Sequence, residues 1–178
     1  MDYMEEAALR LKRKNQILFS REGLWELDLL LRQQNRRTVV CWAFEMAADI
    51  LEELSARLPG EERPAGCLAA ARRWAAGEIK MPEAKRAILA CHAAAKELPP
   101  YEAALCHALA QGCSVVHTSG HAMGLPLYEL TALVRRDGLA ECRPAVEKRL
   151  SRYLERLSWW ASHPEAQTGP WAKFLERT

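Results

Sequence analysis

The chain has 178 residues, of which 49% are hydrophobic and 27% charged, and its formal net charge is +2. A chain of this length can form one domain with a core, because it buries roughly 70% of its unfolded surface on folding. The small net charge argues against nucleic-acid binding, which depends on clustered cationic side chains that neutralise phosphates. No apolar run approaches the roughly 20 residues of a membrane span, and no secretion signal is visible. We therefore expect a soluble, cytoplasmic protein without a nucleic-acid or membrane partner.

Alanine and leucine are abundant and β-branched residues are few, a composition that favours helices over strands. Prolines and glycines divide the chain into segments whose apolar residues recur at helical spacing. Pro64 fits the first turn of one such helix, and Gly77 fits its left-handed end. The expected helices span residues 1–19, 24–34, 36–58, 64–76, 82–96, 100–120, 126–136 and 144–160. We predict a single all-α domain over residues 1–178, a bundle of about seven or eight helices.

Two parts of this bundle are expected to be peripheral, residues 1–34 and residues 139–178. The helix at 24–34 is apolar nearly all round and is expected to be well covered by its neighbours. Trp159 and Trp160 are adjacent, so both cannot face the interior from the same helix. One of these two tryptophans is therefore a candidate for a dimer or partner surface.

Residues able to do chemistry cluster in the segment 100–130, which holds three of the five histidines. On a helical wheel, one narrow stripe of this segment contains Ala103, Cys106, Ala110, Cys113 and His117. All of these except the histidine are small, which predicts that another helix approaches the stripe closely. The six cysteines of the chain form no CxxC pair, and we expect them to be buried and reduced.

The spacing of this stripe gives little support to a metal or hydrolase site. Cys113 with His117, or His117 with His121, are four residues apart and could share one metal ion. Cys113 and His121 lie about 12 Å apart along a straight helix, so all three residues cannot bind the same ion. The zinc-hydrolase signature has a glutamate directly after its first histidine, and here that position is Thr118. We expect no metal, no cofactor and no catalytic residue set.

The helix is expected to break near Gly120, because Gly120 and Gly124 precede Pro126. Such a break places free backbone groups beside the histidines. A polar pocket between helices, able to bind a small ligand or support a reaction, is therefore the alternative to simple packing. The candidate lining residues of this pocket are Glu78, His92, His107, His117 and His121.

Three segments carry a family resemblance: 61–79 (EERPAGCLAAARRWAAGEI), 84–97 (AKRAILACHAAAKE) and 106–128 (CHALAQGCSVVHTSGHAMGLPLY). Together they resemble the immunity-five-like family of bacterial immunity proteins, over roughly residues 38–136. The matching positions are Arg63, Pro64, Arg73, Trp74, Gly77, Glu78, His92, His107, His117 and His121. The resemblance implies a compact all-α protein that binds and neutralises a toxin, and it brings no catalytic residues with it. We therefore expect a non-enzymatic interaction protein whose partner is a toxin-like protein or a second copy of the chain.

Overall fold

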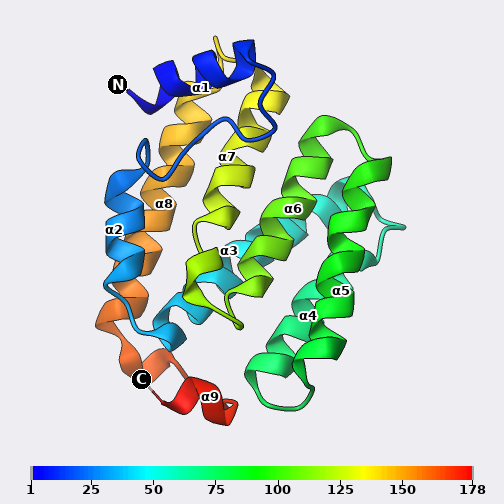
Figure 1. Ribbon diagram of the computed structural model, residues 1–178, viewed down its shortest axis with the longest axis vertical. Coiled ribbons are helices and arrows are strands. Elements are labelled where there is room, and N and C mark those ends of the chain that lie inside the picture. The colour runs from blue at the N-terminus through cyan, green and yellow to red at the C-terminus, as the bar shows by residue number, and fades with distance from the viewer. Residues whose placement is uncertain (1, 178) are drawn as a thin grey trace.

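The computed structural model describes residues 2–177 and, within that range, contains nine α-helices and no strand (Figure 1). Eight of the nine have seven residues or more, so the predicted all-α fold is confirmed. None of these helices is both long enough and apolar enough to cross a membrane. The helices are α1 (Tyr3–Lys12), α2 (Trp25–Arg32), α3 (Arg36–Arg57), α4 (Arg63–Ala75), α5 (Met81–Ala94), α6 (Pro100–Ser114), α7 (Gly124–Asp137), α8 (Arg143–Ser162) and α9 (Lys173–Glu176), with short 3-10 turns η1 (Ala95–Glu97), η2 (Ser119–His121) and η3 (Pro164–Ala166).

Helix α6 is the central helix of the bundle and packs against α3, α4, α5 and α7 (Figure 1). Small residues allow this packing, and Cys106 and Cys113 are both fully buried. At Gly112, an added Cβ atom would lie 2.6 Å from Leu125 Cδ1 of α7 and 3.6 Å from the carbonyl oxygen of Ala43 in α3. Three helices therefore meet at this glycine, and a larger residue here would displace the Leu125 side chain.

Helix α6 ends at Ser114, earlier than the break predicted at Gly120. The guanidinium group of Arg36, at the start of α3, donates hydrogen bonds to the carbonyl oxygens of Val116 and His117 at 3.1 and 3.0 Å. Val116 and His117 lie beyond the end of the helix, where their carbonyl groups have no partner within it. Arg36 supplies a hydrogen bond to each, so a contact from a distant part of the chain holds the segment that follows the early break.

The N-terminal helix is shorter than the predicted 1–19, whose first residue lies outside the described range. Helix α1 ends at Lys12, and an irregular segment connects it to α2. Within this segment Leu18 and Phe19 are 0% and 1% exposed, and the Leu18 amide donates a hydrogen bond to Thr131 Oγ1 at 3.0 Å. The hydrogen bond to Thr131 and the burial of both side chains hold this irregular segment against α7. The predicted length of this helix is therefore wrong.

Helix α2 lies at the margin of the molecule, alongside α8 (Figure 1). Its inner face carries Leu27 and Leu31, which are buried in the core. On its outer face Trp25 is 65% exposed and Leu29 is 48% exposed. The expectation that this helix is well covered is therefore wrong for its outer face, because only the inner face packs against the bundle.

Helix α4 ends in a Schellman motif centred on Gly77, whose φ is +78°. The amide of Glu78 donates to the carbonyl of Arg73 at 2.9 Å, and the amide of Gly77 donates to the carbonyl of Trp74 at 3.0 Å. The predicted left-handed end of this helix is confirmed. The C-terminal segment packs onto this turn, so a Cβ atom added to Gly77 would lie 3.3 Å from Ala172 Cα.

We predict that Gly77→Ala lowers the free energy of unfolding by about 1–2 kcal/mol, because an L-residue pays this cost in the left-handed region. The added methyl group also meets Ala172. Gly66→Ala, within the same helix, is the matched control, because nothing lies within 4 Å of its added Cβ. This control should raise stability by about 0.5–1 kcal/mol. Urea denaturation of both variants measures the difference, and equal stabilities would contradict the role given to Gly77.

Candidate functional site

The structure brings two of the five predicted pocket residues together, His92 of α5 and His107 of α6. Their Nδ1 atoms lie 2.7 Å apart, and their ring centroids are 5.0 Å apart. The ring of Tyr128 in α7 lies 5.0 Å from that of His107, centroid to centroid. A shallow cavity of about 370 Å³ opens beside His107 and Tyr128. The pair therefore connects two helices at the edge of a small hollow.

The other three predicted pocket residues lie elsewhere. Glu78 is exposed, and its Oε2 lies 3.3 Å from Nε of Arg73. His117, exposed after the end of α6, stacks on Trp74 with the ring centroids 6.4 Å apart. His121 is exposed in η2, near His117. The five residues are thus divided among separate contacts and do not line one common pocket.

The hydrogen bond between His92 and His107 requires one Nδ1 atom to carry a proton and the other to accept it. Burial, together with the neighbouring His107, lowers the pKa of His92 to about 4. Burial also lowers the pKa of His107. Both imidazoles are therefore neutral at neutral pH, and the pair joins α5 to α6. Within residues 2–177, no group of three or more His, Cys, Asp and Glu side chains is arranged to hold a metal ion.

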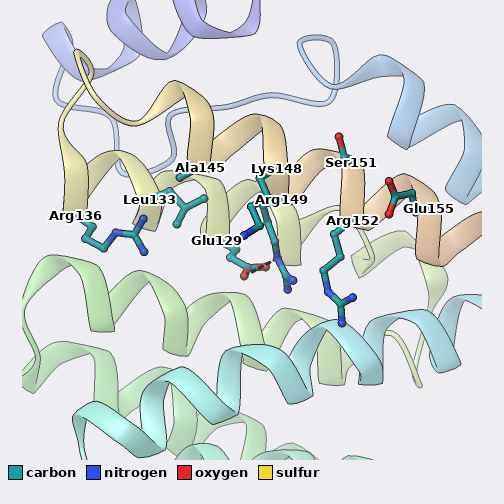
Figure 2. Close-up of a pocket in the computed structure, with 9 residues that line it drawn as sticks. All are labelled: Glu129, Leu133, Arg136, Ala145, Lys148, Arg149, Ser151, Arg152 and Glu155. Atoms are coloured by element: carbon teal, nitrogen blue, oxygen red, sulfur yellow. Dashed lines mark ion pairs between the residues drawn. The ribbon is translucent and has the colours of Figure 1, made fainter.

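A charged groove of about 730 Å³, which sequence reasoning missed, runs along α7 and α8 opposite α3 (Figure 2). Figure 2 shows Arg149 and Arg152 extending from α8 toward α3, with the Glu129 carboxylate beside Arg149. The lining residues are Glu129, Leu133, Arg136, Ala145, Lys148, Arg149, Ser151, Arg152 and Glu155. Four of these residues are positively charged, and such a groove can bind an anion if the charges are not already paired within the protein.

The floor of this groove is a network of ion pairs. Nη1 of Arg149 lies 2.7 Å from Oδ2 of Asp49 in α3, and its Nε lies 2.8 Å from Oε1 of Glu129, an ion-pair contact without hydrogen-bond alignment. Tyr153 donates a hydrogen bond to the second oxygen of Glu129. Burial raises the pKa of Glu129, and the Arg149 guanidinium opposes this shift. Arg152 also binds Asp49, at 2.7 Å.

The arginines of the groove are thus already paired with carboxylates of the protein. Arg149 and Arg152 pair with Asp49, and Arg136 contacts Asp137 at 2.6 Å. The fourth cation of the lining is Lys148. Only Lys148 forms no ion pair with another described residue. The ion pairs in the groove therefore join α3, α7 and α8. They leave little free positive charge for a ligand. The sequence carried one signal for this network of ion pairs, the spacing of its charged residues. Carboxylates lie four residues apart on α3, and arginines lie three or four residues apart on α8.

The two adjacent tryptophans of α8 are both partly buried. Nε1 of Trp160 donates a hydrogen bond to Oε2 of Glu45 in α3 at 2.6 Å, and the ring packs against the core. The Trp159 ring stacks on His163 with the centroids 4.5 Å apart, and the Arg156 guanidinium lies 4.4 Å above it. Each ring therefore already has partners within the chain, and neither is among the exposed large hydrophobic residues.

Trp25, on the outer face of α2, is the most exposed large hydrophobic residue among those that the structure describes. Trp25 and Leu29 are four residues apart and lie on the same face of the helix. We call these two residues the α2 ridge. A cavity of about 170 Å³ next to Trp25 opens between α2 and α8, with Leu150 and Leu154 in its wall. The spacing of the two residues was visible in the sequence, but their exposure depends on which helices surround α2.

We predict that Glu129→Ala lowers the free energy of unfolding by about 3–5 kcal/mol, because it removes a charge partner from the buried Arg149. Glu147→Ala is the control, since Glu147 forms only an exposed pair with Arg143 at 3.4 Å. That change should cost less than about 1 kcal/mol. Urea denaturation measures both, and similar losses in the two variants would show that burial does not strengthen the Glu129 contact.

We also predict that the histidine pair makes the fold sensitive to acid. Because His92 is neutral in the folded chain, the unfolded chain alone binds this proton as the pH falls from its ordinary pKa of 6.5 toward about 4. Stability should therefore decline across this range. His92→Gln should reduce the loss between about pH 7.5 and pH 5, measured as the shift in urea midpoint. An unchanged pH dependence in His92→Gln would rule out this role.

Comparison with known proteins identifies the family of the chain. The sequence model of the family described as "Imm-5 like putative immunity protein" matches residues 29–156, which is more than half of the chain. This range includes α3 to α7 and most of α8, and therefore both the histidine pair and the charged groove. No significant match was found among curated proteins or among solved structures. The resemblance stated from the sequence is confirmed, and the chain belongs to the Imm-5 like family.

Proposed function

We propose that this protein is a non-enzymatic immunity protein that binds a toxin protein in the bacterial cytoplasm and neutralises it by direct contact. Membership of the Imm-5 like family supports the class of partner. The observation that carries the proposal is the α2 ridge, where Trp25 is 65% exposed and Leu29 is 48% exposed. The toxin would cover this ridge in the complex.

The apolar side chains of the α2 ridge are exposed to water in the free protein, so their burial by a partner would stabilise the complex. Burying a large apolar side chain is worth about 1.5–3 kcal/mol, and tryptophan is enriched among the residues that dominate protein interfaces. The hollow between Trp25 and α8 adds shape to this surface, because Leu150 and Leu154 supply further apolar area beside the indole ring. Ridge and hollow together offer a partner both a projection and a depression to fit.

The α2 ridge is also held rigidly before any partner arrives. Leu27 and Leu31 anchor the inner face of the helix in the core. On its side, Asp28 forms ion pairs with Arg21 at 2.8 Å and with Arg32 at 2.7 Å, which fix the helix and the turn before it. A side chain on a fixed helix loses less conformational freedom on binding than one on a loop, so more of the contact energy appears as affinity.

We predict that the double variant Trp25→Ala with Leu29→Ala loses the ability to neutralise the toxin while remaining folded. In the test, genes that flank the gene for this chain are expressed one at a time, and the product that arrests bacterial growth is the candidate toxin. Co-expression of the wild-type chain should restore growth and yield a stoichiometric complex. The double variant should restore no growth and bind at least about a hundredfold more weakly.

Leu89→Ala provides the matched control, because Leu89 is 54% exposed on α5, on the opposite side of the molecule from α2 (Figure 1). This variant should protect growth as the wild type does. Circular dichroism and urea denaturation confirm that each variant is folded. Full protection by the double variant would remove the α2 ridge from the interface, and growth restored without any complex would contradict neutralisation by direct contact.

A further inference from the structure

A cavity of about 430 Å³ opens between α3, the end of α4 and the C-terminal segment that follows α8. Its wall carries three aromatic side chains from different elements, Phe44 of α3, Trp160 of α8 and Trp171 of the C-terminal segment. All three rings are only partly buried. Pockets for small molecules have this size and are lined mostly by apolar and aromatic side chains with a few polar groups. We call this cavity the aromatic pocket.

The C-terminal wall of the aromatic pocket is held in place by hydrogen bonds. Nε2 of Gln167 donates to Oγ1 of Thr38 in α3 at 2.8 Å. Nε1 of Trp171 donates to the carbonyl oxygen of Gln167 at 3.1 Å, and the amide of Ala172 donates to the carbonyl oxygen of Ala75 in α4 at 2.7 Å. A wall that is ordered before a ligand arrives loses less conformational freedom on binding.

Two charged residues line the aromatic pocket, and only one of them is engaged within the protein. The carboxylate of Glu45 accepts a hydrogen bond from Nε1 of Trp160 at 2.6 Å and lies 2.7 Å from Nε of Arg156. The guanidinium group of Arg72 forms no ion pair and no hydrogen bond with another residue between 2 and 177. Unpaired cations occur elsewhere on the surface, but Arg72 shares its cavity with three aromatic rings.

The remaining reactive group of the wall, the Cys41 thiol, adds no charge to the aromatic pocket. Burial raises the pKa of this thiol to about 11, so it is neutral at pH 7 and acts as a small apolar group. The pocket therefore combines an apolar wall with one free guanidinium group. A guanidinium group can bind a carboxylate through two parallel hydrogen bonds, which fix the orientation of the bound group.

We infer that the aromatic pocket binds a small aromatic carboxylate, with its ring against Trp160 and Trp171 and its carboxylate group on Arg72. None of the residues that line this pocket belongs to α2, so the inference does not depend on the proposed function. The ring supplies most of the buried apolar area, and the carboxylate gives orientation and specificity. A ligand of about a dozen heavy atoms binds with a Kd of roughly 1 mM or tighter at ordinary ligand efficiency.

The test uses the ¹⁵N-labelled full chain and two probes that share an indole ring but differ in charge, indole-3-acetate and tryptamine. The six tryptophans give separate indole N–H signals in NMR spectra, which single Trp→Phe variants assign. Indole-3-acetate should shift the signals of Trp160 and Trp171 in a saturable way, with a Kd below about 1 mM. It should leave the signal of Trp25 in place, although Trp25 is 65% exposed. Tryptamine should bind at least about tenfold more weakly, because its ammonium group meets Arg72.

Three variants locate the binding. Arg72→Gln should weaken the binding of indole-3-acetate about tenfold, because it removes the charge partner of the carboxylate. Arg73→Gln is the matched control, since Arg73 is the next residue, is also exposed and does not line the pocket, and it should bind as the wild type does. Ala48→Phe places a ring inside the cavity and should abolish binding. Urea denaturation confirms that each variant is folded.

Two results would overturn the inference. Shifts at Trp25 as large as those at Trp160 and Trp171, or shifts that do not saturate, would show that the indole ring binds without a specific pocket. Equal binding of indole-3-acetate and tryptamine, unchanged in Arg72→Gln, would show that the pocket does not recognise a carboxylate. Neither result bears on the α2 ridge, whose test is protection of bacterial growth.

Discussion

The close approach of helices around α6 is the constraint on which this fold depends. Four helices contact α6, and the backbone of α3 and a side chain of α7 meet at Gly112. Small residues are required wherever such contacts occur, which explains why cysteine and alanine recur in this helix. The same packing decides the chemistry of the thiols. The neighbouring Cys91 thiol and burial raise the pKa of Cys106, so this cysteine is a small core residue and not a nucleophile.

A second set of contacts, between charged groups, holds α3, α7 and α8 together on the other side of the bundle. Arg149 connects Asp49 to Glu129, and Tyr153 donates a hydrogen bond to the other oxygen of that glutamate. Perturbed pKa values are often taken as signs of an active site, but ion-pair networks produce them as well. Here burial raises the pKa of Glu129 while its ion-pair partner Arg149 opposes the shift, and burial lowers the pKa of both histidines in the His92 and His107 pair. The interior is polar in places, and its polar groups are engaged with one another.

Local signals in the sequence predicted much of the fold, because prolines and glycines act on their own neighbours. The start of α4 near Pro64 and its end at Gly77 follow from residue type alone. Features set by distant residues could not be predicted in this way. Leu18 is held by Thr131, and Arg36 satisfies the carbonyls that follow α6, so both segments depart from their helical patterns.

The candidate site shows the same limit more strongly. A helical wheel places residues on one helix, but it cannot tell which helices face each other. His107 and His117 were grouped because they share a segment, yet the chain leaves the helix before His117, and the partner of His107 comes from α5. The exposure of Trp25 was missed for a related reason, since a helix that is apolar all round is covered only if neighbours exist on every side.

The position of the α2 ridge relative to the family match has a consequence for specificity. The match begins at residue 29, so Trp25 of the α2 ridge precedes it and Leu29 is its first residue. The matched region contains the central helix and the ion-pair network that hold the bundle together. Under the proposed function, the contact of Trp25 with the partner lies outside the part of the chain that the family model describes, whereas the scaffold that holds α2 in place lies inside it. Partner choice then depends on α2 more than on the matched scaffold.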